Sequence, residues 1–550
     1  MSDTTFNAAS RAAALDTAHV GDIQGALGTI RLGDTARRAG WKAKLSTLMA
    51  VVGPGLIVMI GDNDAGAFGT YTQAGQNYGT SLLWTLLLLV PVLYVNQEMV
   101  LRLGAVTGVG HARLILERFG KFWGAFSVID LFILNGLTIV TEFIGINFAL
   151  GFLGVPKLWG IIVAAGIIIA AASTGSFRRF ERFSLALCFF SLLLVPVFMM
   201  VHPPLAELGR DFVLPRLPTG SRLSDVMLLV IAIVGTTVAP WQLFFQQSYV
   251  IDKRITPRFM AYEKADLVLG IIVVVVGAVA MMAFTAAAFA GTAGFGQFTD
   301  AGAVAVGLQA SAGRAAGVMF ALALLDASII GASAVSLSTA YAIGDVLALR
   351  HSLHRRPTDA IGFYLVYAGL IAVAAALVLL GSDVLLGLLT NAVQTLAGVL
   401  LPSATVFLLL LCNDRAVLGP WVNGRWLNLF TGAVIWALVM LSITLTAATL
   451  FPAMSGDAII AILGGGSLLG IVGFAGFKLA RRRDTGPAAP APARAALAAE
   501  RAGWRMPPLD MLPPARLSRA KRLWMAILRG YLIAAVVLVA VKVVQIALGQ

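Results

Sequence analysis

Two aspartates, Asp62 and Asp64, interrupt an otherwise apolar segment that runs from Val51 to Gly66. A carboxylate at the centre of a membrane-spanning helix costs about 2.5 to 3.5 kcal/mol, so two of them need a compensating cavity, ion or partner. On a regular helix, residues two apart point about 200° away from each other and could not hold one ligand together. In an unwound segment, either carboxylate could coordinate a cation with help from free backbone carbonyls. The alternative is that one of the aspartates only caps the next helix.

The elements that position these residues are membrane-spanning helices. The chain has 550 residues, of which 59% are hydrophobic and 12% are charged, and its apolar runs repeatedly reach the ~20 residues that cross a bilayer as a helix. We therefore predict an all-α polytopic membrane protein with twelve spans between residues 45 and 479 and a thirteenth at 528–547. Lysines and arginines account for the net charge of +13 and lie between the spans. This distribution argues for membrane topology and against nucleic acid as a partner.

The spans and the composition divide the chain into five parts. We expect a polar, cytoplasmic N-terminal segment (1–44), a transporter core of ten helices (45–411) and two further spanning helices (412–480). An Ala/Pro-rich cytoplasmic linker (481–527) and an extra spanning helix (528–550) follow. Basic residues precede the first span and fill every second connection, which predicts a cytoplasmic N-terminus. We expect an integral protein of the bacterial cytoplasmic membrane; the sequence leaves the oligomeric state open.

Two spans contain corresponding interruptions. The first is broken at Gly61–Gly66, and the sixth is broken at Gly235–Gln242, where Pro240 excludes a continuous helix. Paired breaks five spans apart favour inverted repeats, with a transport site where unwound carbonyls and half-helix ends face a shared cavity. The alternative is a proline kink that serves packing alone.

Several motifs resemble those of Nramp-type divalent metal transporters, and most closely a divergent branch similar to Nramp-related magnesium transporters. They are Gly53-Pro-Gly followed by Asp64, Gln73-Ala-Gly75, Leu83-Trp84, Arg102–Gly108, Thr141-Glu-Phe-Ile-Gly145 and Gly235–Ser248. The resemblance covers roughly residues 45–410. It implies a LeuT-type inverted five-helix repeat, divalent cations as transported substrate and no cofactor.

The departures from the family's motifs bear on the choice of ion. Where the family has Asp-Pro-Gly-Asn, this chain has Asp64 followed by Ala65, Gly66 and Ala67, so the aspartate is retained and the Asn amide oxygen is absent. Ala239 replaces the Met of the sixth-span Met-Pro-His motif. Losing a thioether shifts preference towards harder ions, and a roomier site could admit an ion that keeps several waters. Mg²⁺ or Mn²⁺ is therefore the favoured substrate, and Asp62 could replace the missing ligand.

Further candidates lie in several spans. Thr236 could offer a backbone carbonyl to the ion, and Gln242 and Gln394 could offer amides; a structural hydrogen bond is the alternative for each. Three residues are candidates for coupling or for the pathway: Glu142, Asp326 and Thr237. Aligned through Glu142, the family's other acidic positions in the third span fall on Phe132 and Ile139, so transport without proton coupling is plausible.

Two other functional classes remain as alternatives. A cation-coupled carrier of amino acids or other small organic solutes could share this fold, with half-helix N-termini binding a substrate carboxylate. Two aspartates at the first break argue against it because they would repel that carboxylate. An enzyme would need a motif such as His-Glu-x-x-His, which is absent, so the chain is interpreted as a transporter that works in a lipid bilayer.

Overall fold

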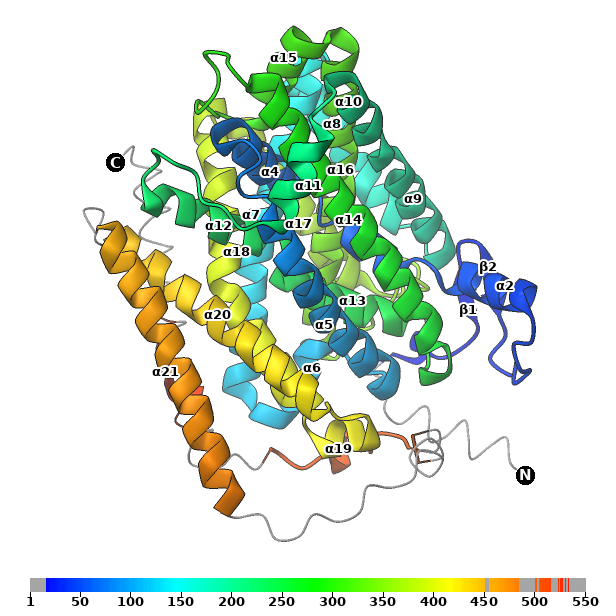
Figure 1. Cartoon of the computed structure of the whole chain (residues 1–550). Coiled ribbons are helices and arrows are strands. Elements are labelled where there is room, and N and C mark those ends of the chain that lie inside the picture. The colour runs from blue at the N-terminus through cyan, green and yellow to red at the C-terminus, as the bar shows by residue number, and fades with distance from the viewer. Residues whose placement is uncertain are drawn as a thin grey trace.

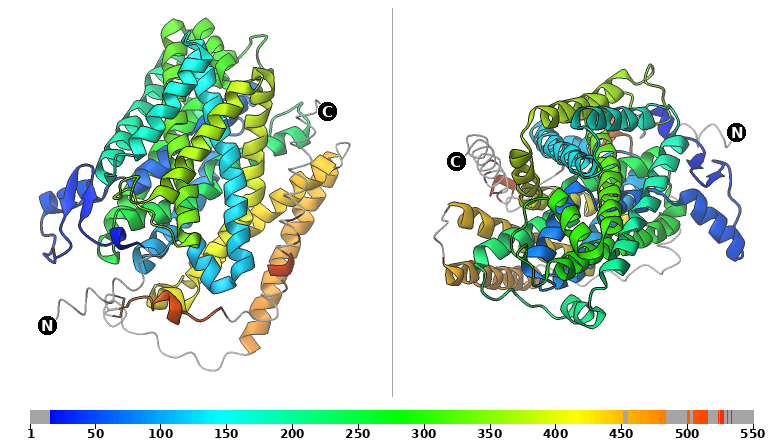
Figure 2. Two further views of the ribbon diagram at one scale, coloured as in Figure 1. Left: turned by 180° about the vertical axis from the view of Figure 1, so that it is seen from behind. Right: turned by 90° about the horizontal axis from the view of Figure 1, so that it is seen from above.

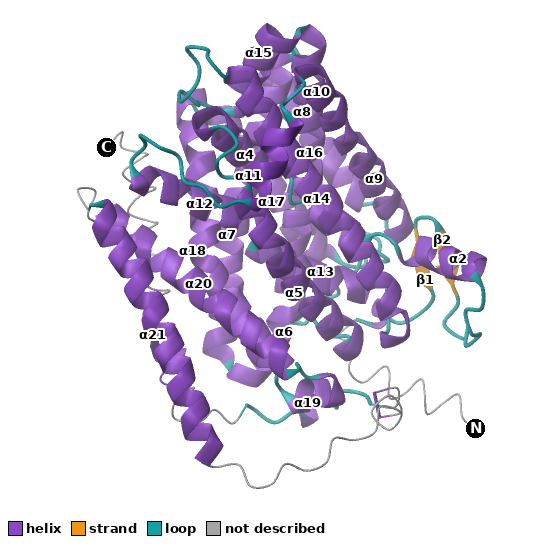
Figure 3. Cartoon of the chain, in the orientation of Figure 1, coloured by secondary structure: helices purple, strands orange, loops and turns teal. Residues whose placement is uncertain are grey.

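The computed structural model describes residues 16–450, 455–483, 500–501, 504–515, 523, 525–527, 530 and 533. The predicted spanning helix at 528–547 lies outside the described residues apart from two positions, as does most of the predicted linker. The described chain is a bundle of helices with one small hairpin (Figure 3).

Ten stretches of the described chain are long and apolar enough to cross a membrane. Six of them are each a single helix: α5 (Trp84–Thr107), α7 (Lys121–Phe152), α16 (Arg314–Leu347), α17 (Ile361–Leu380), α20 (Arg425–Leu450) and α21 (Gly456–Arg483). The others are α18 (Asp383–Cys412), α14 (Met260–Phe289) with η3 (Pro257–Phe259), α9 (Phe177–Phe190) with η2 (Ser191–Leu193) and α10 (Leu194–Val201), and α12 (Leu223–Thr237) with α13 (Pro240–Asp252).

The difference from the twelve predicted spans lies in two places. The predicted fourth span is α8 (Lys157–Ala172), which has only 16 residues, and the predicted first span is divided among three short helices. These are α2 (Trp41–Val51), α3 (Pro54–Ile60) and α4 (Ala65–Tyr78). Shorter connecting elements are α6 (His111–Phe119), α11 (Leu205–Val213), α15 (Ala301–Ala312), α19 (Arg415–Leu418), η1 (Thr17–His19), η4 (Gly419–Trp421) and η5 (Leu509–Met511).

Both predicted interruptions are confirmed. Helix α3 ends at Ile60 and α4 begins at Ala65, while α12 ends at Thr237 and α13 begins at Pro240. Proline has no backbone N–H, so the carbonyl of Thr236, four residues before it, loses its helical donor. The two breaks lie inside the bundle: α14 packs against both α3 and α4, and α12 packs against α18 and α4.

The bundle has two ends, which Figure 1 shows at the top and the bottom. Helices α4 and α15 belong to the upper half, here called the α15 end, and α13 and α6 belong to the lower half, here called the α6 end. Helix α16 packs along α7 through the centre, whereas α20 and α21 lie at the periphery (Figure 2). The two interrupted helices are thus enclosed by long continuous ones.

A polar network fixes the start of α3. Asp266 on α14 accepts hydrogen bonds from the N–H groups of Gly53 and Gly55 at 3.0 and 2.7 Å. Lys253, at the end of α13, donates to Glu181 at 2.5 Å and to the carbonyl of Val52 at 2.8 Å. A carboxylate at a helix N-terminus and an ammonium on a free carbonyl both satisfy backbone groups that the break leaves open.

The polar N-terminal segment contains structure that the sequence did not predict. Strands β1 (Ile23–Gly25) and β2 (Gly28–Ile30) form an antiparallel hairpin in which Ile23 pairs with Ile30. The hairpin lies against the side of the bundle, next to α2 and α9 (Figure 1). The Ala26 N–H at its turn donates to Glu181 at 2.5 Å.

Candidate functional site

Asp64 caps the second half of the first interrupted helix. It is the N-cap residue of α4, and its Oδ1 accepts a hydrogen bond from the Ala67 N–H at 2.9 Å. The side chain is buried, with 4% of the residue exposed. Capping uses one carboxylate oxygen and leaves the other able to bind a ligand, so the capping and cation-binding interpretations are compatible.

Glu142 is the partner of Asp64. Its Oε2 accepts a hydrogen bond at 3.1 Å from the N–H of Ala65, the residue directly after Asp64. Gly331 on α16 permits this approach, because a Cβ there would lie 2.8 Å from Glu142 and 3.0 Å from the Cβ of Asp64. The structure thus joins a primary candidate to a pathway candidate across α4, α7 and α16.

Asp62 has a different set of neighbours. Its Oδ1 accepts a hydrogen bond from Gln242 Nε2 on α13, and Gln242 Oε1 in turn accepts from Gln97 Nε2 on α5 at 2.8 Å. Asp62 is 1% exposed, and among the described residues its Oδ2 has no hydrogen-bond partner. In this arrangement Gln242 presents its amide nitrogen to Asp62, and its oxygen is occupied by Gln97.

Thr236 on α12 and Gln394 on α18 contact each other next to the first turn of α4. Thr236 Oγ1 donates to Gln394 Oε1 at 2.8 Å, and the hydroxyl of Thr70 lies 3.4 Å from that of Thr236. Gln394 passes directly over Gly66, where an added Cβ would lie 1.6 Å from its Nε2. Thr236, whose carbonyl has no helical donor, and the Gln394 amide are therefore adjacent to α4.

The remaining candidates are spread more widely. Ala239 is the buried N-cap residue of α13, and the hydroxyl of Thr237 lies 2.7 Å from that of Tyr71. Asp326 accepts from Ser191 on η2 at 3.3 Å. It therefore faces α9 and α10 rather than Glu142, and the structure does not bring it into the group around Asp64.

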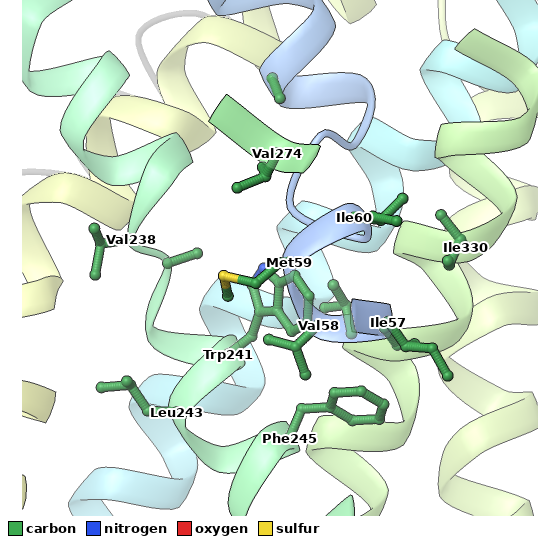
Figure 4. Packing of buried hydrophobic residues seen from close by; sticks show 14 of the residues in the cluster. Ile57, Val58, Met59, Ile60, Val238, Trp241, Leu243, Phe245, Val274 and Ile330 are labelled. Carbon is green, nitrogen blue, oxygen red and sulfur yellow. The ribbon is translucent and has the colours of Figure 1, made fainter. Parts of the chain in front are cut away.

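A narrow cavity with room for about one water molecule lies beside the start of α4 towards the α15 end. Its lining includes Ala65 and Gly69 from the start of α4 and Thr141 beside Glu142. Residues near the loop before α15 complete it, among them Phe298, Asp300 and Ala301. On the α6 side of the break, apolar side chains pack tightly: Figure 4 shows Trp241 next to Met59 and Val58, with Phe245 beyond.

Sequence reasoning missed Gln97, Thr70 and Tyr71. Gln97 and its neighbour Asn96 are consecutive polar residues inside an apolar span, and that signal could have identified them. Among the described residues, no group of three or more His, Cys, Asp or Glu side chains could hold a metal ion. Any cation at the break must therefore use amide, hydroxyl or backbone oxygens, or water, in addition to one or two carboxylates.

Comparison with known proteins identifies the family. Residues 55–448 match the family model named Nramp, described as natural resistance-associated macrophage protein-like. The chain belongs to the Nramp family. The resemblance seen in the sequence is confirmed, and so is the interpretation as an integral membrane transporter and not an enzyme.

Relatives and a solved structure agree with this assignment. A divalent metal cation transporter MntH from Pectobacterium carotovorum is 28% identical over 429 residues, which are 76% of this chain and 97% of that protein. Another MntH, from Ralstonia nicotianae, is 30% identical over 417 residues, covering 71% and 88%. A crystal structure of a manganese transporter from Eremococcus coleocola has a TM-score of 0.59 at 19% identity, covering 82% of this chain and 99% of that one. The predicted all-α fold is confirmed.

Proposed function

We propose that this Nramp protein transports divalent metal cations by alternating access around Asp64, and that it favours Mg²⁺, with Mn²⁺ as the next candidate. The observation that supports this most directly is the pair of buried aspartates at the first break, 1% and 4% exposed, which no lysine or arginine neutralises among the described contacts. Buried carboxylates without a cationic partner are costly unless an ion or a proton compensates them. The names of the relatives support a divalent metal as that ion.

The ligands available at this site are mostly hard oxygen donors. Asp64 contributes a carboxylate, Thr236 a free carbonyl and Gln394 an amide. Ala239 supplies a methyl group where the family motif has a thioether, and Ala67 replaces the family's Asn. Oxygen ligands and space for retained waters favour Mg²⁺, which dehydrates reluctantly, over softer transition metals.

We also propose that transport does not require a coupled proton. Glu142 is the only acidic position of the family's third span that this chain keeps, and Phe132 and Ile139 stand at the other two. A proton on Glu142 therefore finds no titratable group at either of these two positions along α7. The membrane potential would then drive uptake of the cation.

The proposed orientation places the N-terminus and the α6 end in the cytoplasm. The basic connections predict it, and the cavity at the α15 end would then open to the outside and lead towards Asp64. This route would let an external cation reach the first break without crossing the apolar packing around Trp241 and Met59.

Reconstitution tests the proposal. Purified protein in liposomes is supplied with Mg²⁺, Mn²⁺ or Ca²⁺ under an inside-negative potential while internal pH is recorded, and the same is done for Asp64→Ala. Uptake of Mg²⁺ without acidification, and its loss in Asp64→Ala, is expected. Asp359→Ala, at an exposed position, is the matched control. Uptake of Mn²⁺ with exclusion of Mg²⁺ contradicts the ion preference, and unchanged uptake in Asp64→Ala contradicts the site.

A further inference from the structure

We propose that Asp62, Gln97 and Gln246 form a second station for a partly hydrated divalent cation, separate from Asp64 and on the α6 side of the break. The inference rests on the proposed transport function. It assigns the two aspartates to successive positions of the ion instead of to one shared site, and it makes Gln242 the residue that orients Asp62 and Gln97 around the second position.

The two carboxylates face different elements. Asp64 and Glu142 both lie against Gly331 on α16, and Ala65, the residue after Asp64, donates to Glu142 and lines the cavity at the α15 end. Asp62 faces Gln242 on α13 and, through it, Gln97 on α5. Helix α13 begins at the second break and leads to the α6 end. An ion arriving from the cavity therefore meets Asp64 first and Asp62 second.

The charge of an ionised Asp62 determines the direction of the hydrogen bonds from Asp62 through Gln242 to Gln97. An ionised carboxylate can only accept, so Gln242 turns its NH₂ group towards Asp62 and its oxygen towards Gln97. Gln97 must then donate its NH₂, which leaves Gln97 Oε1 as a buried acceptor without a partner among the described residues. At the two ends of this series of hydrogen bonds, one oxygen each of Asp62 (Oδ2) and Gln97 (Oε1) has no hydrogen-bond partner among the described residues.

A third unpartnered group lies one helical turn further along α13. Gln246 is fully buried, and neither its oxygen nor its nitrogen has a hydrogen-bond partner among the described residues. Residues four apart share one helix face, so Gln246 lies below Gln242 on the way to the α6 end. Buried polar atoms without partners indicate water or an ion. One carboxylate with amide oxygens and water is a suitable set for Mg²⁺ that keeps part of its hydration shell.

Separate measurements of binding and transport test the second station. Mg²⁺ binding to the full-length protein in detergent is measured by titration calorimetry, and Mg²⁺ uptake is measured in liposomes, for Asp64→Asn and Asp62→Asn. We expect Asp64→Asn to lose both. We expect Asp62→Asn to keep its Mg²⁺ affinity within about threefold of wild type and to lose about tenfold or more of its uptake rate.

The alternatives give different results. Equal loss of binding and uptake in Asp62→Asn would mean a single shared site and would overturn the second station. Unchanged binding and unchanged uptake in that variant would also overturn it, because Asp62 would then have no contact with the ion. Normal uptake in Asp64→Asn is a separate outcome that contradicts the proposed function itself.

Gln97 provides an independent test because it has no direct contact with Asp62. Gln97→Leu removes both the open oxygen of Gln97 and the amide group that donates to Gln242, and we expect uptake to fall about tenfold with unchanged Mg²⁺ affinity and thermal stability. Gln97→Glu restores the open oxygen but not the donor to Gln242, and it is expected to recover part of that rate. Gln76→Leu is the control, since Gln76 is also a buried glutamine but donates to the Gly294 carbonyl elsewhere. Full activity in Gln97→Leu, or no recovery in Gln97→Glu, overturns the role of Gln97.

Discussion

Buried aspartates at the centre of the bundle and at its α6 end differ in how many hydrogen bonds their carboxylate oxygens accept. At the α6 end, Asp252 accepts from Tyr341 Oη at 2.5 Å, Ser352 Oγ at 2.5 Å and the Leu353 N–H at 2.8 Å. At the centre, Asp62 accepts one hydrogen bond and keeps one oxygen open. Both residues are nearly inaccessible, at 0% and 1% exposure.

Asp16 repeats the pattern of Asp252. It accepts from the N–H groups of Ala18 and His351 and forms an ion pair with the Arg355 guanidinium, whose closest N–O distance is 2.5 Å. These contacts tie the N-terminal segment to the connection between α16 and α17. Burial of a carboxylate therefore does not by itself indicate function in this molecule. The complete sets of donors around Asp16 and Asp252 indicate a structural role, whereas the open oxygen of Asp62, at the break in the first span, is a position for a ligand.

The largest expected effect is on Mg²⁺ uptake, and it comes from a substitution at the centre of the bundle that leaves the fold intact. Asp64→Asn keeps the size of the side chain and removes its charge, so we expect uptake of Mg²⁺ to fall about a hundredfold, because the amide attracts the cation poorly. The melting temperature in detergent should stay the same or rise, since a poorly compensated buried charge is lost. A large fall in melting temperature would mean that Asp64 has a structural role, as Asp16 and Asp252 do.

At the α6 end we expect the opposite: a substitution should lower stability and leave transport by the folded protein unchanged. Asp252→Asn leaves donors from Tyr341, Ser352 and Leu353 without their charged acceptor, and we expect the free energy of unfolding to fall by about 3 kcal/mol. Denaturation in detergent measures this. The folded fraction should transport Mg²⁺ at the wild-type rate per molecule. A stable variant with no uptake would show that Asp252 acts on the ion, and the comparison would fail.

The sequence predicted the elements better than it predicted the contacts between them. Hydropathy located the spans, and Gly, Pro and Asp located both breaks, because these signals act within a few residues along the chain. The hairpin at 23–30 was missed, since three-residue strands in a polar segment have no periodic pattern to detect. The first span was predicted as one interrupted helix, but the chain also bends by 53° between α2 and α3.

The site was predicted only in part for a similar reason. Asp62, Asp64 and Glu142 stood out because charges are rare in apolar spans. The contact of Gln97 with Gln242 joins residues 145 apart, and no local pattern encodes it. Which aspartate caps α4 depended on where the helix starts within a three-residue interval, and such boundaries are weakly determined by sequence. The roles of all these residues stay predictions until transport is measured.

A change at Ala239 sharpens the comparison by asking which region sets the ion preference. Ala239→Met restores the thioether that the family has at this position, and we expect the ratio of Mn²⁺ to Mg²⁺ uptake to rise about tenfold because sulfur favours softer ions. Competition between the two ions in liposomes measures the ratio. Asp252→Asn should leave it unchanged. An unchanged ratio in Ala239→Met would mean that the ion does not approach the start of α13.

The smallest expected effect concerns pH and the Asp16–Arg355 pair. Burial alone would raise the pKa of Asp16, but the hydrogen bond to Arg355 and the surrounding N–H groups hold this pKa well below its usual range. A lowered pKa gives stability that is present above the unfolded pKa and is lost as the pH falls. We expect wild type to lose about 1 kcal/mol from this source between about pH 5 and about pH 3.

Arg355→Gln should reduce that loss, because the pKa of Asp16 then moves back towards its usual value. The difference between variant and wild type isolates Asp16 from the nearby histidines: burial lowers the pKa values of His19 and His354 in both proteins. Burial acts in the same direction on His351, but Asp345 raises its pKa, so its charge is constant over this acidic range. Thermal unfolding at each pH measures the effect, with Arg356→Gln at an exposed position as the control. Equal acid sensitivity in Arg355→Gln and wild type would mean that Asp16 is satisfied without Arg355, and that backbone donors alone suffice to hold a buried carboxylate at this end of the bundle.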